Sequence, residues 1–340
     1  MTPHLPAGYT ARPVVREDAE AVLSLLHAVT RAVSGEVDNS LKDLLDEWDD
    51  PDLDLARDSR VVLTPDGRLI AYALLWSKTR EALPFADIFL HPDEWETDAL
   101  TERFLLAWAE ARAWENVPAL DPSLRVALRI YCDSREARLL GIFASEGYPA
   151  IRYSFRMGIT FDGPPEPGAL PASFTLRVVE KEDDPLPVLD AFLDAWRDHF
   201  GYLEIPYEER LASWQHHWNE QFEPGLWLLA MDGETVAGLC LNFRRFGEDE
   251  TMGFIELVAV RRAYRRRGLA EAMLRASFAA LYAAGNTSAC LFVDGESLTG
   301  ATRLSERVGM SVESRYVLSE KELRPGIDPS THEVGAAVTV

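Results

Sequence analysis

The segment Phe254–Ala284 reads FIELVAVRRAYRRRGLAEAMLRASFAALYAA and decides the fold of this protein. It begins with Phe254–Val260, an apolar run of strand length that is rich in β-branched residues. Five arginines occur within the next seven residues, and Gly268 follows them. From Leu269 on, apolar residues recur with the spacing of one helix face. The segment therefore predicts a strand, an arginine- and glycine-rich turn, and a helix.

A turn of this kind is suited to a pyrophosphate. The first amides of a helix have no partner inside the helix. The helix dipole adds a partial positive charge there, which stabilises an exposed anion by about 0.3–1 kcal/mol. Gly268 lets the backbone approach a ligand closely, and neighbouring arginines can bind phosphate with two hydrogen bonds each.

The arginines can also be read as a solvated charge run or as a basic patch for nucleic acid. Their place between an apolar strand and an apolar helix argues against a solvated run. The chain carries a formal net charge of −22, which repels a polyanion. We therefore expect no nucleic-acid partner.

Residues 260–270 resemble the acetyl-CoA motif of the GCN5-related N-acetyltransferases (GNAT), Gln/Arg-x-x-Gly-x-Gly/Ala. Arg265, Gly268 and Ala270 occupy its three defining positions, and Arg262 stands where many members have proline. The resemblance implies that the strand backbone pairs with the pantetheine arm of acetyl-CoA and that the turn amides hold its pyrophosphate. The cofactor-binding residues it implies are Val258, Ala259, Val260, Arg265, Arg266, Arg267, Gly268, Leu269 and Ala270.

Composition places the chain among ordinary soluble proteins. Its 340 residues suffice for two domains, and 47% are hydrophobic and 26% charged. No apolar run approaches the roughly 18 residues of a membrane span, and Met1–Pro6 lacks the features of a signal peptide. The three cysteines form no Cys-x-x-Cys pair, which favours buried thiols in a reducing compartment and no metal site. We expect a cytoplasmic protein without a membrane partner.

The chain repeats one pattern twice. Residues 9–18 parallel residues 174–183, each a short strand followed by an acidic helix start. An Asp-Gly hairpin turn follows in both halves, at Asp66 and Asp232. Because the landmarks keep their order and spacing, we predict a duplicated domain.

The predicted fold is α+β: two tandem GNAT domains, each a mixed, mostly antiparallel sheet flanked by helices. The predicted ranges are 1–160 for a degenerate first domain, 161–172 for a linker, 173–323 for the domain with the acetyl-CoA site, and 324–340 for a loose tail. In an alternative, Val338–Val340 adds a terminal strand. The layout resembles that of mycothiol synthase-like acetyltransferases.

The first copy lacks the phosphate-binding turn. After the strand-like residues 87–90 and His91-Pro92, acidic residues replace the arginines and the glycine. They are Asp93, Glu94, Glu96 and Asp98. Carboxylates cap a helix start well but repel a pyrophosphate. We interpret the first copy as a scaffold; the alternative is that it binds a cation or a substrate amine there.

Glu256 and Ser305 are the candidate catalytic residues. Strand alternation places Glu256 on the face of Val258 and Val260, as a base acting directly or through water. Its alternative is a strand carboxylate paired with an arginine, and many family members place glutamate where Phe254 stands. Ser305 stands where the family commonly has tyrosine, the candidate acid for the leaving thiolate. Alternatively it donates through water, the thiolate leaves unaided, or catalysis is weak.

The segment between the first strand and the hairpin of the second copy contains aromatic, acidic and histidine residues around Trp196–Trp218. Such a lining suits a cationic amine; the alternative is that the tryptophans are core and the histidines surface.

Together these patterns predict an acetyl-CoA-dependent N-acetyltransferase of a small amine, active in its second domain. The alternative is a catalytically weak acyl-CoA sensor or partner-binding module. Leu298 stands where the family commonly has asparagine.

Overall fold

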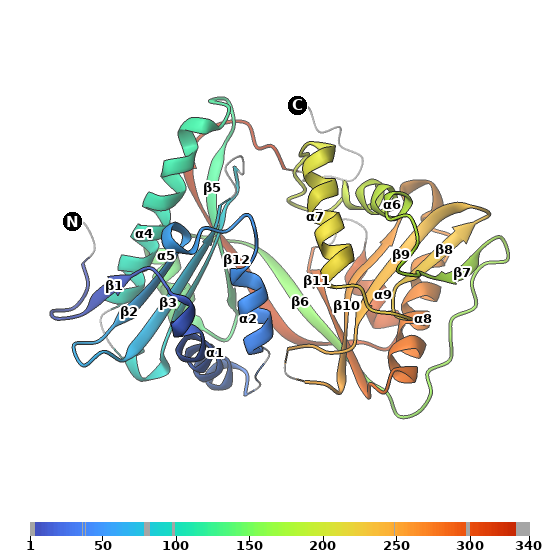
Figure 1. Cartoon of the computed structure of the whole chain (residues 1–340), viewed down its shortest axis with the longest axis horizontal. Coiled ribbons are helices and arrows are strands. Elements are labelled where there is room, and N and C mark those ends of the chain that lie inside the picture. Colours follow the sequence, from blue (N-terminus) through green and yellow to red (C-terminus); the bar gives the residue numbers. More distant parts are fainter. Residues whose placement is uncertain are drawn as a thin grey trace. The chain divides into compact units, whose positions relative to one another are not determined.

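The two repeats fold as two α/β units, each with a mixed sheet covered by helices on both faces (Figure 1). The computed structural model describes residues 4–35, 37, 39–77, 82–96, 99–247, 249–296 and 300–330. The first unit contains the residues up to Tyr153 together with Arg315–Asp328, and the second is built on Ser154–Ser314. The predicted fold class is confirmed.

The sheet of the first unit has the strand order β1-β2-β3-β4-β5-β12. Only the pair β4 and β5 is parallel. Its elements are β1 (Thr10–Arg12), α1 (Ala19–Val33), α2 (Leu41–Trp48), α3 (Leu55–Asp58), β2 (Ser59–Leu63), β3 (Leu69–Trp76), β4 (Phe85–Leu90), α4 (Leu100–Asn116), β5 (Val126–Asp133), α5 (Ala137–Ser145) and, from the end of the second repeat, β12 (Ser311–Arg324). Helices α1 and α2 pack on one face of the sheet, and α4 and α5 pack on the other.

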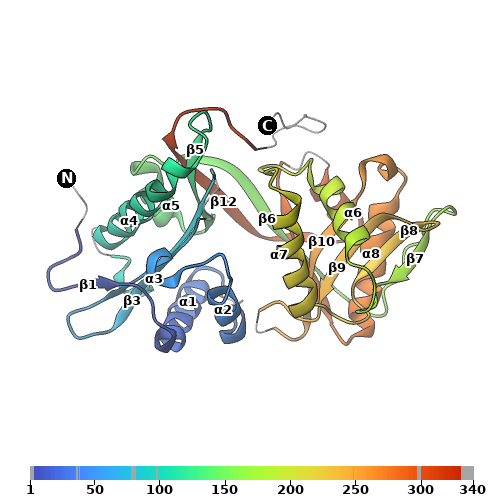
Figure 2. The same cartoon turned by 45° about the horizontal axis from the view of Figure 1, so that its top comes forward.

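The sheet of the second unit has the order β6-β11-β10-β9-β8-β7, with β10 and β11 parallel. Its elements are β6 (Ala150–Thr160), β7 (Thr175–Val178), α6 (Leu186–Trp196), α7 (Tyr207–Glu220), β8 (Leu228–Asp232), β9 (Thr235–Phe243), β10 (Met252–Val260), α8 (Leu269–Ala283), β11 (Ser288–Asp294) and α9 (Ala301–Arg307). Helices α6 and α7 cover one face and α8 the other (Figure 2).

Each unit completes its sheet with the last strand of the other repeat. Strand β6 ends the first repeat, but from Ser154 to Thr160 it pairs with β11 of the second unit. Strand β12 ends the second repeat, but from Tyr316 to Arg324 it pairs with β5 of the first. The predicted ranges 1–160 and 173–323 therefore follow the repeats, whereas the compact units change at Tyr153 and Ser314.

The predicted linker and the start of the predicted loose tail both make close contacts. An ideal Cβ on Gly168 of the 161–172 linker would lie 2.8 Å from the Cα of Ala272, so only glycine allows this approach to α8. Beyond β12, the amide of Ile327 donates to the carbonyl of Ser123, and the guanidinium of Arg324 donates to three backbone carbonyls of the first unit. The first residues of the 324–340 tail are thus hydrogen-bonded to the first unit. The alternative strand Val338–Val340 lies outside the described residues.

All three cysteines are buried. Within the described ranges, every helix is too short or too polar to cross a bilayer.

Candidate active site

The cleft of the second unit forms where two parallel strands separate. Strands β10 and β11 pair only from Met252 opposite Ser288 to Phe254 opposite Cys290. Beyond Phe254, β10 keeps its pairing with β9, but no other described strand pairs with it on the β11 side. A cavity of about 470 Å³ opens there, lined by both strands, the turn before α8, the start of α9 and the residues after α6.

A β-bulge at Glu256 corrects the predicted orientation of this side chain. Ile255 lies opposite Asn242 and Leu257 opposite Leu241, so β10 has one extra residue between them. Ile255 and Val258 pack on the α8 side, whereas Leu257 packs on the α6 and α7 side. A bulge places two consecutive side chains on one face. Because Oε2 of Glu256 lies 3.5 Å from Nε2 of His217 on α7, Glu256 shares the face of Leu257 and not that of Val258. The prediction from strict alternation was wrong.

The turn before α8 has the geometry of an anion site. Arg266 has φ of +62° and Gly268 has φ of +77°, both left-handed. In the described part of the chain, the amides of residues 266–270 donate to no backbone carbonyl. Alternation of left- and right-handed residues turns successive N–H groups into one concavity, at a helix N-terminus. Nothing lies within 4 Å of the position that a Cβ on Gly268 would take, and Gly268 lines the cavity.

Most of the arginines hold the turn in place. The guanidinium of Arg265 donates to the carbonyls of Val260 (3.1 Å) and Ala195 (3.0 Å) and pairs with Asp198. Arg262 pairs with the same carboxylate at 2.5 Å, and only 1% of the Asp198 side chain is exposed. The guanidinium of Arg265 therefore anchors the turn to the end of α6 and to Asp198 after it, and cofactor binding by Arg265 stays a prediction.

The other three arginines of the turn, Arg261, Arg266 and Arg267, lie in different surroundings. Arg261 lies 3.3 Å from Asp194. Arg267 donates to the carbonyl of Ala263 and lies against Tyr264, away from the cavity lining. Arg266 lines the cavity, and among the described residues it has no ion pair. The structure thus leaves Arg266 as the arginine best placed to meet a phosphate.

Glu256 lies in the cavity with a raised proton affinity. About two fifths of its side chain (41%) is exposed, and this residue lines the cavity. Burial by the surrounding protein raises its pKa to about 7. The predicted alternative, an ion pair with an arginine, is not found within the described ranges. Its neighbour is instead His217 on α7, whose Nε2 lies 3.5 Å from Oε2 of Glu256.

Ser305 also lines the cavity, but its hydroxyl is occupied. Its Oγ donates to the carbonyl of Ala301 at 3.1 Å, and the residue is 2% exposed. A hydroxyl whose only proton is bound to the helix backbone is poorly placed to protonate a leaving sulfur. This geometry argues against the predicted role as acid. Leu298 lies outside the described residues.

The aromatic segment Trp196–Trp218 contains both core residues and residues that line the cavity, so each of its two interpretations holds for part of it. Trp214 and Trp218 are buried in the core of the second unit. Trp196 and His199 stack with ring centroids 4.3 Å apart, and both line the cavity.

Sequence reasoning missed the anchoring role of Asp198, because no local pattern connects it with arginines 64 and 67 positions later. Among the described residues, no cluster of three potential metal ligands occurs.

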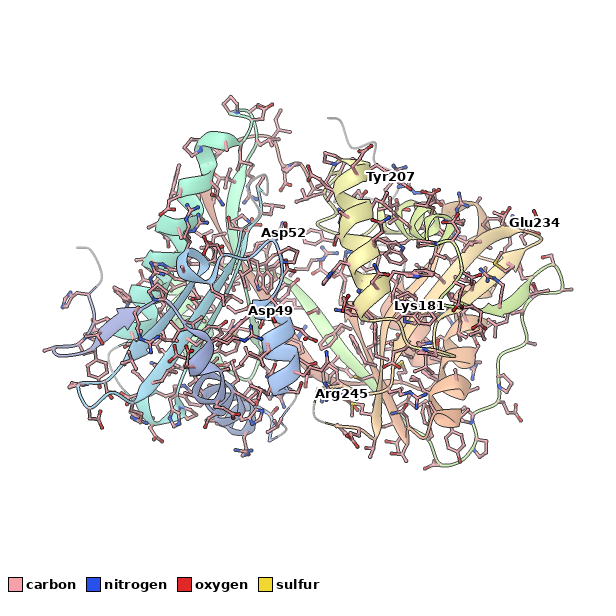
Figure 3. The ribbon with its side chains drawn as sticks, in the orientation of Figure 1. Asp49, Asp52, Lys181, Tyr207, Glu234 and Arg245 are labelled. Atoms are coloured by element: carbon pink, nitrogen blue, oxygen red, sulfur yellow. The ribbon has the colours of Figure 1, made fainter. Side chains whose placement is uncertain are left out.

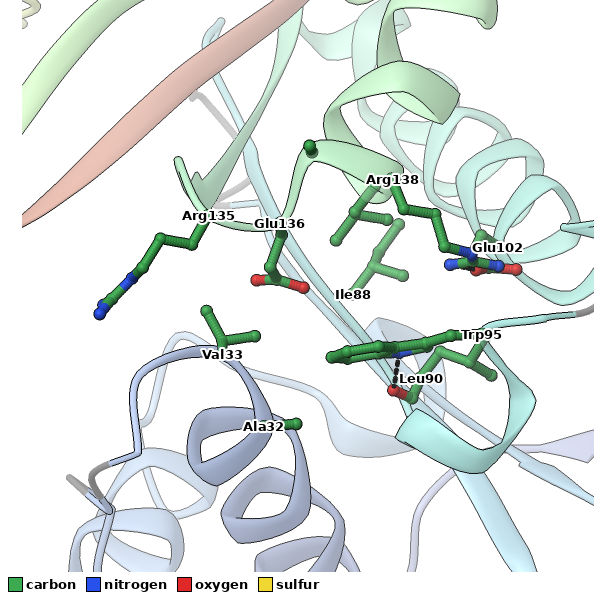
Figure 4. Close-up of a pocket in the computed structure, with 11 residues that line it drawn as sticks. Ala32, Val33, Ile88, Leu90, Trp95, Glu102, Arg135, Glu136 and Arg138 are labelled. Atoms are coloured by element: carbon green, nitrogen blue, oxygen red, sulfur yellow. Dashed lines mark hydrogen bonds and ion pairs between the residues drawn. The ribbon is translucent and has the colours of Figure 1, made fainter.

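The first unit retains a smaller version of this cleft. Strands β4 and β5 pair only at Phe85 and Ala86 and then separate, and Ala99 (φ +59°) precedes α4 with the left-handed conformation that Gly268 has before α8. The cavity measures about 200 Å³ (Figure 4). Trp95 lies in it and donates from Nε1 to the carbonyl of Leu90 at 2.9 Å.

Charge in the first cleft is unsuited to phosphate. Arg138 on α5 lies 2.5 Å from the fully buried Glu102 in the first turn of α4. At the turn, Glu94 and Asp93 both pair with Arg68. Glu96 follows them, and Asp98 lies outside the described residues. The structure therefore agrees with an acidic turn, as the sequence indicates.

Comparison with known proteins gives the same fold. The model of the family described as "Acetyltransferase (GNAT) family" matches residues 189–310. The structure resembles a GCN5-related N-acetyltransferase from Sphaerobacter thermophilus with 32% identity and a TM-score of 0.81, covering 96% of this chain and 99% of that one. No curated protein matches the chain.

Two more distant structures share the fold alone. A tandem GNAT protein from the clavulanic acid biosynthesis pathway is 15% identical with a TM-score of 0.69, covering 94% of this chain and 100% of that one. The glucosamine N-acetyltransferase region of a fungal multi-domain β-N-acetylglucosaminidase is 11% identical with a TM-score of 0.67, covering 93% of this chain and 38% of that one. The resemblance to mycothiol synthase-like enzymes stays a prediction. The full-length match at 32% identity and the GNAT description agree, so the chain belongs to the GCN5-related N-acetyltransferase family.

Proposed function

We propose that this protein transfers the acetyl group of acetyl-CoA to a small amine in the cytosol, and that the reaction takes place in the cavity of the second unit. One observation carries the proposal. One cavity is lined by the edge of β10 from which β11 has separated, by Arg266, Gly268, Leu269 and Ala270, and by a carboxyl group with a pKa near 7. In the described part of the chain, the amides of these four turn residues donate to no backbone carbonyl.

The residues present fit acetyl-CoA. The amides of residues 266–270 are placed to hold the pyrophosphate, and Arg266 adds a positive charge. The unpaired edge of β10 at Val258–Val260 offers backbone groups to the amides of the pantetheine arm. Leu269 and Ala270 begin α8 at the cavity and carry two of the amides. When bound, acetyl-CoA supplies a thioester carbon that an amine can attack.

Glu256 supplies the proton acceptor. An alkylamine is mostly an ammonium ion near neutral pH and must lose a proton before it attacks. The carboxylate of Glu256 takes this proton. A C–N bond forms as the C–S bond breaks. The nitrogen loses a second proton as it becomes an amide, and this proton passes through water to the departing thiolate. Positioning of the two reactants in one cavity contributes much of the remaining rate.

Calorimetric titration with acetyl-CoA, followed by a screen of amines with detection of free thiol, tests the proposal. We expect one site per chain, located in the second unit, and acetylated product by mass spectrometry. Binding without turnover of any amine would favour the second candidate, an acyl-CoA sensor, for which the occupied hydroxyl of Ser305 is the supporting observation. Absence of binding would refute both.

A further inference from the structure

His217 lies in an aromatic box on the inner side of α7. Its ring stacks on Trp227 with centroids 5.4 Å apart and on Trp214 at 5.8 Å. Phe243 meets it edge-on at 6.1 Å. A ring held on three sides cannot turn without displacing core side chains. The direction of its nitrogen atoms is therefore fixed by packing.

Helix α7 itself is fixed at the end that carries His217. Lys181 donates from Nζ to the carbonyls of Trp218 (2.6 Å) and Asn219 (3.0 Å) in the last turn of the helix. Figure 3 shows Lys181 and Tyr207 at opposite ends of α7. A cation at a helix C-terminus satisfies carbonyls that lack a helical partner and complements the helix dipole. His217 thus stands on a rigid support.

The Nε2 atom of His217 has no hydrogen-bond partner in the described part of the chain, although it is buried. Buried polar atoms in native proteins are nearly always paired, so an unpaired one calls for an explanation. The nearest charged group is the carboxyl of Glu256, with Oε2 3.5 Å away. The bulge in β10 is what turns this carboxyl toward α7. Two irregular features, an unpaired nitrogen and a bulge, therefore meet at one place.

We propose that His217 is the positioning residue for Glu256: its Nε2–H group binds Oε2 and holds the carboxyl in the cavity with Oε1 free to accept the proton of the acceptor amine. The inference rests on the proposed function for its catalytic meaning. The contact itself does not depend on it.

Protons balance without a change of tautomer. Before transfer, the carboxylate accepts a hydrogen bond from Nε2–H at Oε2. The ammonium gives its proton to Oε1, which leaves a neutral carboxyl, a neutral imidazole and a free amine. The carboxyl later releases that proton to solvent. Burial, and next to it the charge of His216, lowers the pKa of His217 to about 4, so the imidazole is neutral throughout.

The other charged side chains around the cavity do not take the place of His217 beside Glu256. His216 on α7 is exposed. The cavity lining also contains Asp198 and His199 after α6, Asp294 on β11, Glu271 on α8 and Arg307 on α9. Since Nε2–H stabilises the ionised carboxylate, removing it will raise the pKa of Glu256.

Nitrogen NMR of protein with labelled histidine tests the contact without any acetyl transfer. His217→Phe keeps the ring packing and assigns the His217 signals by their loss. We expect wild type to show the Nε2–H tautomer and a shift of the His217 signals with a midpoint near pH 7, reporting Glu256. Glu256→Gln should abolish this step, and His216→Phe should preserve it. A His217 tautomer protonated on Nδ1, or a step that persists in Glu256→Gln, would overturn the inference.

Kinetics supplies the second readout once an acceptor amine is known. His217→Phe should move the acid limb of kcat/KM upward by about half a pH unit or more, with the KM for acetyl-CoA unchanged. His217→Gln, which keeps an N–H donor, should recover part of that shift. A lowered kcat with an unmoved acid limb would overturn the positioning role. Turnover with a failed NMR test refutes this inference alone, whereas a positive NMR test without turnover refutes only the proposed function.

Discussion

The turns after β4 and β10 occupy matching places in the two units and differ in one informative exchange. Five residues after the last residue of β10, Arg265 donates from Nε to the carbonyl of Val260. Five residues after the last residue of β4, Trp95 donates from Nε1 to the carbonyl of Leu90. An indole replaces a guanidinium, the backbone hydrogen bond is kept, and the positive charge is lost. The turn as a fold is therefore separable from the turn as an anion site.

The left-handed residues before α4 and α8 show the same separation of the fold from the anion site. Gly268 adopts φ of +77° at no steric cost, whereas Ala99 adopts φ of +59° with a Cβ. A left-handed non-glycine residue costs roughly 1–2 kcal/mol. The first unit bears this cost although its turn is acidic, because the strand-to-helix geometry of the fold requires it.

The largest expected effect comes from breaking the turn of the second unit. Gly268→Val should weaken acetyl-CoA binding by about 100-fold or more, since the side chain enters the open space beside the amides and resists a positive φ. Calorimetry measures it. Gly285→Val at the other end of α8 is the matched control, because Gly285 also has a positive φ (+104°) and open space. Equal affinity in the two variants would contradict the phosphate site.

Next in size is the loss of the base. Glu256→Gln should lower kcat by about 10²–10⁴-fold and leave acetyl-CoA affinity nearly unchanged. Because only the carboxylate accepts a proton, wild-type activity should rise with pH through about 7, and this limb should vanish in the variant. A pH–rate profile that is the same in both proteins would remove Glu256 as the base.

Asp198→Asn sharpens the comparison, because a buried acid holds Arg262 and Arg265 in the second turn, whereas the acids Asp93 and Glu94 of the first turn pair with the exposed Arg68. We expect a loss of about 1–3 kcal/mol in the free energy of unfolding of the second unit, since two arginines lose their shared, buried carboxylate. Urea unfolding followed by fluorescence measures it. The control is Asp194→Asn, whose more exposed pair with Arg261 should contribute at most about 1 kcal/mol.

Ser305→Ala should change kcat by less than about threefold, because the hydroxyl proton is bound to the carbonyl of Ala301. Steady-state kinetics at saturating acetyl-CoA measures this. A loss of tenfold or more with unchanged thermal stability would restore Ser305 as the acid.

The smallest effect is expected from Trp95→Arg, which tests the comparison directly. The new guanidinium can reach the carbonyl of Leu90, but the acidic turn remains and the sequence of residues 96–99 is unchanged. We therefore expect the stoichiometry of acetyl-CoA to stay at one per chain in calorimetry. A second site would mean that one aromatic residue alone closed the first cleft.

Sequence reasoning located the strand, the turn and the helix that border the candidate site. The apolar run, the turn and the helix of 254–284 are contiguous, so propensity and spacing predicted them correctly. The acidic turn of the first copy was also visible. The bulge at Glu256 was not, because the residues on both sides of it still alternate between more and less buried. Hydrogen-bond register, which decides the bulge, leaves no mark in such a pattern.

By itself, then, the sequence determined the family, the repeat and the turn, since each depends on residues that are neighbours in the chain. Only the tertiary structure decided that β6 and β12 exchange units, that Asp198 holds Arg262 and Arg265, and that His217 meets Glu256. Each of these contacts joins segments far apart in the chain. Their partners are chosen by sheet pairing and core packing, which act between surfaces and not between sequence neighbours.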